Sequence, residues 1–143
     1  MVRIALLVAL LLSACDAENP DDELRALMQD MEVATESRNT GFFRGIVAES
    51  YRDARGNDRE RLINLIRAFF LTNSKVEAIV RVQEVSLDGD ASAEVTLQTA
   101  LLSETNGRSL FGLDGDFYTV ELEFLQTGGD WMLIGADWRS ALP

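Results

Sequence analysis

The spacing of apolar residues along the chain changes once, near Lys75, from a helical period to a strand period. Before Lys75, apolar side chains recur every three or four residues, which is typical of amphipathic helices that bury one face. Asn19 and Asp58 stand where N-cap residues are expected, and Pro20 suits the first helical position. The pattern therefore predicts three helices, at residues 20–38, 42–51 and 59–73.

After this change, apolar and polar residues alternate, which is typical of strands with one buried face. We expect four strands, at residues 76–87, 91–101, 118–124 and 131–138. The first strand changes phase between Val82 and Val85, so we predict a β-bulge near Gln83-Glu84. In the second strand, the expected inward residues are Ala91, Ala93, Val95, Leu97, Thr99 and Leu101. Helices followed by strands indicate an α+β domain, with three N-terminal helices packed on an antiparallel four-stranded sheet.

The N-terminal segment has a different pattern, with Arg3 followed by nine apolar residues and then Leu12-Ser13-Ala14-Cys15. This is the layout of a secretory signal peptide, and the last four residues resemble the lipobox of bacterial lipoproteins. The resemblance implies cleavage before Cys15 and lipidation of its thiol. The expected division is a signal peptide at 1–14, a lipidated cysteine and tether at 15–19, and a folded domain at 20–143. The alternatives are an ordinary signal peptide or an uncleaved anchor, although spanning a bilayer takes about 20 apolar residues.

Asp16 directly follows the candidate lipidation site and is similar to the sorting signal that retains enterobacterial lipoproteins in the inner membrane. The alternative is that Asp16 is simply an acidic linker residue. The four tether residues after Cys15 reach at most about 14 Å. The expected location is therefore the bacterial cell envelope, lipid-anchored and facing the periplasm, with the inner membrane favoured over the outer membrane.

Composition narrows the possible chemistry. The chain has 24 acidic and 13 basic residues, and cleavage removes one basic residue, so the mature net charge is −12. Nucleic-acid phosphates should repel such a domain, so nucleic acid is not an expected partner. Anionic lipid headgroups should repel it too, so the acyl anchor must hold the domain at the membrane. Histidine is absent and Cys15 is the only cysteine, which excludes Ser-His-Asp and Cys-His catalysis. We expect no metal site and no cofactor.

Four segments together resemble the nuclear transport factor 2-like (NTF2-like) superfamily, also described as cystatin-like or SnoaL-like. They are the Leu24–Ala34 helix, the segment Tyr51–Gly56, the hairpin Val85–Ala91 and the final strand Gly129–Trp138. The resemblance covers residues 20–139. It implies a curved sheet that wraps the helices as a cone, with an apolar pocket at the open end. Such folds host enzymes, ligand carriers and interaction modules, so the fold alone does not assign the function.

Tyr51, Asp53, Asp137 and Trp138 are the candidate pocket residues. A carboxylate in an apolar pocket has a raised pKa and moves protons, with a tyrosine hydroxyl as hydrogen-bond donor. The favoured interpretation is structural: Tyr51 packs at the core edge, Asp53 caps a turn, Asp137 pairs with Arg139, and Trp138 belongs to the sheet core. Strict alternation would place Asp137 opposite the face shared by Met132, Ile134, Ala136 and Trp138.

These observations predict a non-catalytic, membrane-anchored periplasmic lipoprotein whose domain binds a small apolar ligand or an envelope protein. The alternative function is a small-molecule enzyme of the isomerase or dehydratase type that uses a pocket carboxylate and a tyrosine. A third hypothesis is a homodimer formed through the outer face of the sheet, with Val80, Leu97 and Leu133 as candidate contacts.

Overall fold

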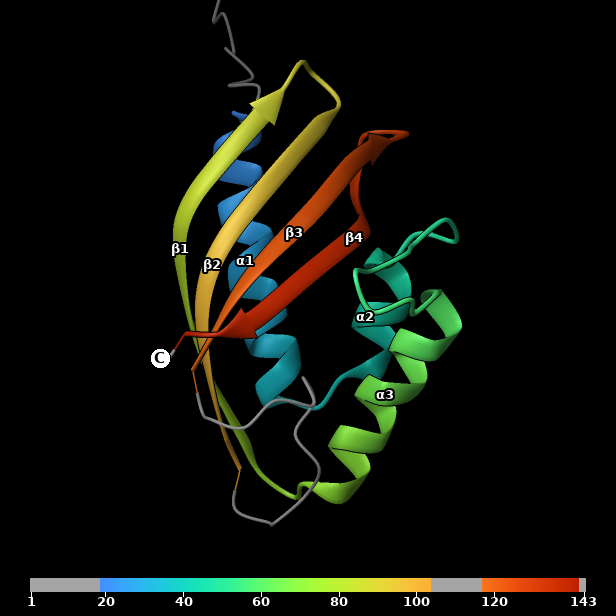
Figure 1. The fold of residues 1–143 in the computed structure, drawn as a ribbon, viewed down its shortest axis with the longest axis vertical. Coiled ribbons are helices and arrows are strands. Elements are labelled where there is room, and N and C mark those ends of the chain that lie inside the picture. The colour runs from blue at the N-terminus through green and yellow to red at the C-terminus, as the bar shows by residue number, and fades with distance from the viewer. Residues whose placement is uncertain (1–18, 104–116, 142–143) are drawn as a thin grey trace, which may run out of the picture.

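A computed structural model describes residues 19–103 and 117–141. Within them, helices precede strands: α1 Pro20–Glu36, α2 Thr40–Ile46, α3 Arg59–Thr72, β1 Val76–Asp88, β2 Ser92–Ser103, β3 Phe117–Thr127 and β4 Asp130–Ser140 (Figure 1). The strands form one sheet in the order β1-β2-β3-β4, and every neighbouring pair is antiparallel. The structure confirms the predicted α+β class.

The helices α1 and α3 begin where the caps predict, whereas α2 begins at Thr40, two residues earlier than predicted. The Asn19 side chain accepts a hydrogen bond from the Asp21 amide at 3.0 Å, and Asp58 accepts one from the Arg61 amide at 2.9 Å. All three helices end earlier than predicted, α3 by a single residue and the other two by more. After α1, Arg38 takes a left-handed φ of 54°, which turns the chain. After α2, Val47 is extended and bridges to β4, so the helix cannot continue to Tyr51.

The sheet contains two register shifts, of which the sequence predicts one. The shift between Val82 and Glu84 confirms the bulge expected in β1. The second lies between β3 and β4, where Glu123 pairs with Gly135 but the next residue, Phe124, pairs with Leu133. One residue of β4 is therefore extra, and the side chains beyond it change face. The strict alternation predicted for this strand is wrong, because Leu133 and Ala136 both face the interior.

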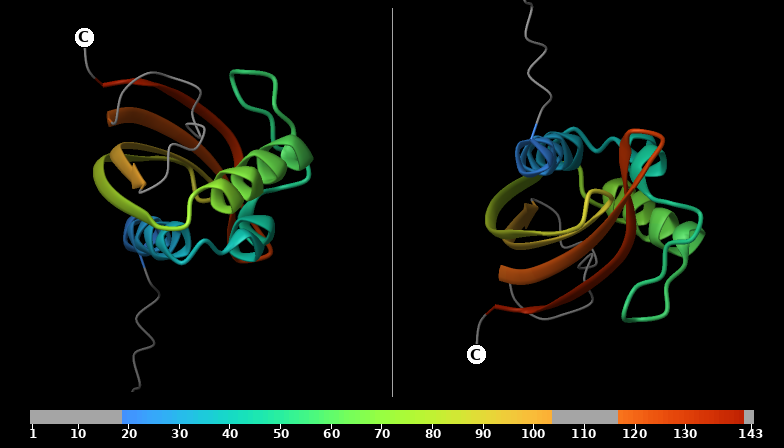
Figure 2. Two further views of the ribbon diagram at one scale, coloured as in Figure 1. Left: turned by 90° about the horizontal axis from the view of Figure 1, so that it is seen from below. Right: turned by 90° about the horizontal axis from the view of Figure 1, so that it is seen from above.

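The curved sheet and the helices enclose a common interior. In the end views, the sheet curves from β1 to β4, α1 lies beside β1, and α3 runs along the concave side (Figure 2). The core combines residues of all seven elements, including the fully buried Leu24, Ile63, Val95 and Phe124. Among the described helices, none is long and apolar enough to cross a membrane.

Both edges of the sheet are covered, but by different groups. At the β1 edge, α1 carboxylates accept hydrogen bonds from backbone amides: Glu32 from Val80 at 3.0 Å, and Glu36 from Ala78 at 3.3 Å. At the β4 edge, the segment after α2 pairs through its backbone. Its amides donate to β4 carbonyls, in the pairs Ala48–Leu133 at 2.9 Å, Arg52–Ile134 at 3.1 Å and Ala54–Ala136 at 3.0 Å. The strand amides and carbonyls engaged in these bonds are not available for pairing with a strand of another chain.

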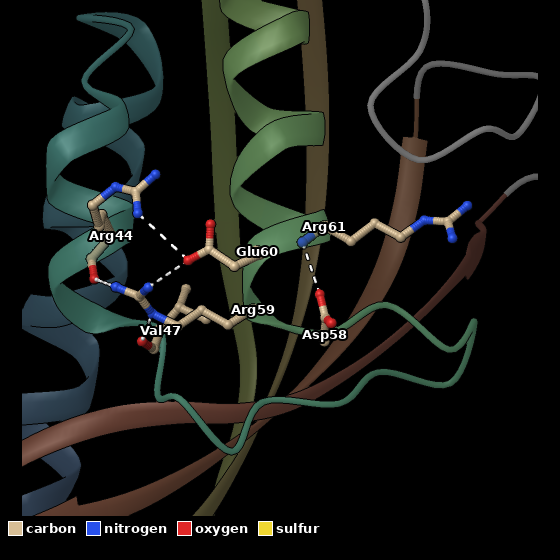
Figure 3. Close-up of polar contacts among 6 residues, drawn as sticks. All are labelled: Arg44, Val47, Asp58, Arg59, Glu60 and Arg61. Carbon is tan, nitrogen blue, oxygen red and sulfur yellow. Dashed lines mark hydrogen bonds and ion pairs between the residues drawn. The ribbon is translucent and has the colours of Figure 1, made fainter.

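Arg59 fixes the start of the segment that covers β4. Its guanidinium donates to the carbonyl of Val47 at 3.0 Å and to that of Arg44 at 2.7 Å, both at the end of α2 (Figure 3). A cation at this position also complements the negative end of the helix dipole. Arg59 further contacts Glu60 at 2.9 Å, and Arg44 lies 3.6 Å from the same carboxylate oxygen. These contacts connect α2 to α3.

Candidate functional site

The concave side of the sheet and the three helices enclose a cavity of about 150 Å³. Most of its lining side chains are apolar. The helices contribute Met28, Met31, Phe43, Leu62, Ile66 and Phe70. The strands contribute residues from all four, among them Ala78, Leu97, Val120, Leu122 and Leu133. Because Leu65 of α3 also lines the cavity while 41 % of its surface is exposed, the cavity reaches the surface beside α3.

Tyr51 lines this cavity and is fully buried. Its hydroxyl donates a hydrogen bond to Oδ2 of Asp53 at 3.0 Å. Burial, the charge of Asp53 and this hydrogen bond together raise the pKa of Tyr51 far above its ordinary range. Tyr51 is therefore a neutral hydroxyl whose single proton points to a carboxylate.

Asp53 is the partner of Tyr51 but is not among the residues that line the cavity. Besides the Tyr51 hydroxyl, its carboxylate accepts from the Arg55 amide at 3.0 Å, from the Asn57 amide at 3.0 Å and from Asn57 Nδ2 at 2.9 and 3.2 Å. These bonds close the turn that returns the chain from β4 to α3. To accept a proton from a substrate, Asp53 would have to give up one of them.

The other predicted pair, Asp137 and Trp138, is divided between two environments. Trp138 lines the cavity, and the guanidinium of Arg55 lies 5.0 Å from its ring centroid. Asp137 is exposed and accepts a hydrogen bond from the Trp138 amide at 2.8 Å. Arg139 reaches Glu121 on β3 at 3.5 Å. The predicted pairing of Asp137 with Arg139 is therefore wrong, because the neighbouring strand offers Arg139 another carboxylate.

Glu32, Thr35 and Thr99 also line the cavity and were not predicted as site residues. Thr99 could have been predicted from the sequence, because the alternation of β2 places this polar residue on an otherwise apolar, inward face. Glu32 and Glu36 recur four residues apart on α1, which puts them on one helix face. Their contact with the β1 edge is long-range, however, and no local sequence pattern predicts it.

The cavity also changes the prediction about dimerisation. Val80, Leu97 and Leu133 were proposed as contacts on the outer face of the sheet, but all three line the cavity. Their positions on the concave side follow from the pleat and from the β4 bulge. The exposed apolar residues Ile79 and Phe117 instead lie at positions that alternate with inward ones. The three predicted contacts are therefore wrong.

The described residues 19–103 and 117–141 contain no group of three acidic, histidine or cysteine side chains placed to hold a metal ion. The lipidation candidate Cys15 and the sorting candidate Asp16 lie outside the described residues.

No protein-family model and no curated protein sequence matches this chain, but solved structures do. An NTF-2 like protein of unknown function from Silicibacter pomeroyi is similar with a TM-score of 0.64 and 14% identity, covering 85% of this chain and 98% of that one. A putative dehydratase from the NTF2-like family of Streptomyces avermitilis has a TM-score of 0.67 and 14% identity, covering 87% and 100%.

Bd1075 of Bdellovibrio bacteriovorus has a TM-score of 0.67 at 11% identity, and the match covers 83% of this chain but 40% of that one. At these identities the comparisons establish the fold alone. The chain has the NTF2-like α+β fold, with three helices packed against a curved four-stranded antiparallel sheet.

Proposed function

We propose that this domain is a non-catalytic binding module that takes a small apolar ligand into the cavity. The observation that carries the proposal is the cavity itself, about 150 Å³ in volume and lined mostly by apolar side chains. Engineered apolar cavities of about this size stay dry and bind benzene or xenon. An empty cavity also forfeits dispersion contacts along its wall, and a ligand that fills it restores them.

The candidate acid–base pair, Tyr51 and Asp53, is occupied by hydrogen bonds within the protein, which supports a non-catalytic role. Tyr51 directs its proton to Asp53, and Asp53 accepts five hydrogen bonds, four of them from the turn that it closes. Neither group is poised to exchange a proton with a molecule in the cavity.

The second candidate function is an isomerase or dehydratase. It is favoured by one observation: Tyr51 lines the cavity and its hydroxyl is bonded to a carboxylate, which is a pairing suited to proton transfer next to a carbonyl. An enzyme of this kind would lose turnover in the Tyr51→Phe variant while ligand affinity stayed within a few-fold. A ligand that is recovered unchanged from prolonged incubation with the wild type would exclude this candidate for that ligand.

We further propose that lipid on Cys15 holds the domain at the periplasmic face of the inner membrane. The lipobox-like sequence, Asp16 and the start of α1 at Pro20 support this arrangement. Cells fed an alkyne-labelled palmitate should label the wild type but not Cys15→Ser. Asp16→Ser should move the protein toward outer-membrane fractions. Unlabelled wild-type protein would contradict the anchor.

Ligand binding is testable by calorimetry with the full chain in lipid nanodiscs, using toluene as the probe and empty nanodiscs as the reference. Ala78 lines the cavity and is 5 % exposed, so Ala78→Leu should fill part of the cavity and weaken toluene binding at least tenfold. Ala68→Leu makes the same change at an exposed position of α3 and should bind like the wild type. The absence of wild-type binding, or equal binding by Ala78→Leu, would contradict the proposal.

A further inference from the structure

The cavity has one polar end, where α1 approaches the β1–β2 pair. Glu32 Oε2 accepts from the Val80 amide at 3.0 Å, and Val80 is paired with Thr99 on β2. Because the Val80 amide points to Glu32 and away from β2, Val80 and Thr99 form a non-hydrogen-bonded pair, whose Cα atoms lie about 4.5 Å apart. Glu32 and Thr99 both line the cavity. Glu32 and Thr99, which are 67 positions apart in the sequence, thus lie at the same end of the cavity.

Thr99 is a buried polar group that has no hydrogen-bond partner among the described residues. Only 7 % of its surface is exposed, and its hydroxyl makes no hydrogen bond to any described residue. Buried hydroxyls are normally paired. Among the described residues, no side-chain polar atom is both unpaired and closed off from any open space. The Thr99 hydroxyl therefore faces open space, and the space that this inward residue lines is the cavity.

The remaining groups at this end offer acceptors. Glu32 uses one carboxylate oxygen for Val80, and its other oxygen makes no hydrogen bond or ion pair with a described residue. Thr35 donates its hydroxyl proton to the Met31 carbonyl at 2.8 Å, so it can only accept a further bond. Among residues 19–103 and 117–141, those that line the cavity include no lysine or arginine. The polar end is therefore negative and rich in acceptors, next to an apolar interior.

We propose that the ligand is a small primary amine with an apolar body of about one ring. Its ammonium group binds Glu32 and Thr99, and its body fills the space between Met28, Ile66 and Leu97. An ammonium is a triple donor without an acceptor, which complements these oxygens, and a charge-assisted bond to a carboxylate is among the stronger hydrogen bonds. The inference rests on the proposed function, since it specifies which ligand the cavity takes.

The chain supplies a matched control in Glu36. It lies one turn after Glu32 and makes the same kind of bond to β1, from the Ala78 amide at 3.3 Å, but it does not line the cavity. Glu32→Gln and Glu36→Gln each remove one charge and keep an oxygen that accepts the strand amide. A difference in amine affinity between the two variants therefore shows that binding depends on the carboxylate in the cavity. An equal loss of affinity reflects only the net charge of the protein.

The test compares benzylamine, toluene and benzoate, which share a ring and differ in the attached group. Titrations use the full chain in nanodiscs of zwitterionic lipid, with empty nanodiscs as reference. Benzylamine should bind at least tenfold more tightly than toluene, and benzoate should not bind. Glu32→Gln should weaken benzylamine about tenfold and leave toluene unchanged. Thr99→Val should weaken benzylamine a few-fold without weakening toluene, and Glu36→Gln should match the wild type.

Toluene binding as tightly as benzylamine, benzoate binding, or equal losses in Glu32→Gln and Glu36→Gln would overturn the amine inference and leave the apolar cavity site standing. If none of the three probes binds, the proposed function fails together with this inference.

Discussion

The two edges of the sheet are covered in contrasting ways. At β4, backbone amides of Ala48, Arg52 and Ala54 donate to strand carbonyls, so the covering segment behaves almost as a further strand. At β1, the carboxylates of Glu32 and Glu36 take the place of backbone acceptors. At the β4 edge, these backbone amides and carbonyls are hydrogen-bonded to one another. The β1 arrangement leaves one oxygen of Glu32, a residue that lines the cavity, without a hydrogen bond to any described residue, so the polar character of the site comes from the β1 edge.

The largest effect is expected from Asp53→Ala, which removes the group that organises the β4-covering turn. The change deletes five hydrogen bonds and leaves the buried Asn57 side chain and the Tyr51 hydroxyl without their acceptor. We expect the free energy of unfolding to fall by about 3 kcal/mol. Urea titration followed by the fluorescence of the two tryptophans measures it. Glu49→Ala, at an exposed position of the same segment, should have almost no effect, and an equally stable Asp53→Ala would refute this view of the β4 edge.

The next effect tests how closely the covering segment approaches β4. A Cβ on Gly135 would lie 2.8 Å from Oε2 of Glu123 and 3.2 Å from the Arg52 carbonyl. Gly135→Ala should therefore cost about 2 kcal/mol of unfolding free energy through overpacking. Adding Glu123→Ala should recover only part of the loss, because the backbone carbonyl remains. Gly45→Ala is the contrast: a Cβ added there meets no atom within 4 Å beyond its chain neighbours and its own helix backbone, so this change in α2 should stabilise the helix.

A smaller, pH-dependent effect is expected at Tyr51, which joins the β4 edge to the cavity. Its pKa is raised in the folded state by burial, by the charge of Asp53 and by their hydrogen bond. The neutral hydroxyl therefore stabilises the fold fully below the unfolded pKa of about 10, and this stabilisation is lost as the pH rises above it. Relative to Tyr51→Phe, the wild type should lose about 1.4 kcal/mol per pH unit above pH 10. Parallel pH profiles of the two proteins would contradict this.

The smallest effects are expected at the β1 edge. Glu32→Ala removes an acceptor at 3.0 Å in a partly buried site and should cost about 1 kcal/mol. Glu36→Ala removes a longer bond of 3.3 Å and should cost about 0.5 kcal/mol. Amide hydrogen exchange at Val80 and Ala78 reports each bond separately. Losses at this edge larger than those of Asp53→Ala would reverse the proposed contrast.

The sequence predicts those features that depend on local patterns. Caps such as Asn19 and Asp58 mark helix starts, and the phase change after Val82 marks the β1 bulge. The β4 bulge escapes prediction because apolar residues occupy both faces of that strand, so Leu133 and Ile134 leave no visible change of phase.

Some residues of the candidate site could likewise be predicted from the sequence, and others could not. Tyr51 and Trp138, which line the cavity, stand out as aromatic residues in segments that resemble a known fold. Glu32 does not stand out, because its place depends on which strand edge α1 covers. Thr99 becomes visible only when the inward face of β2 is known to line a cavity. Long-range packing therefore determines the polar part of the site.

The central claim is that the cavity takes a small apolar ligand, and intermolecular nuclear Overhauser effects test it most directly. The measurement uses the full chain with labelled methyl groups in deuterated-lipid nanodiscs, with benzene added. Contacts from benzene to the methyl groups of Met28, Leu97 and Leu122, which line the cavity, are the predicted result. Contacts confined to Leu71, which is 79 % exposed, or no contacts with the protein at all, would contradict the account.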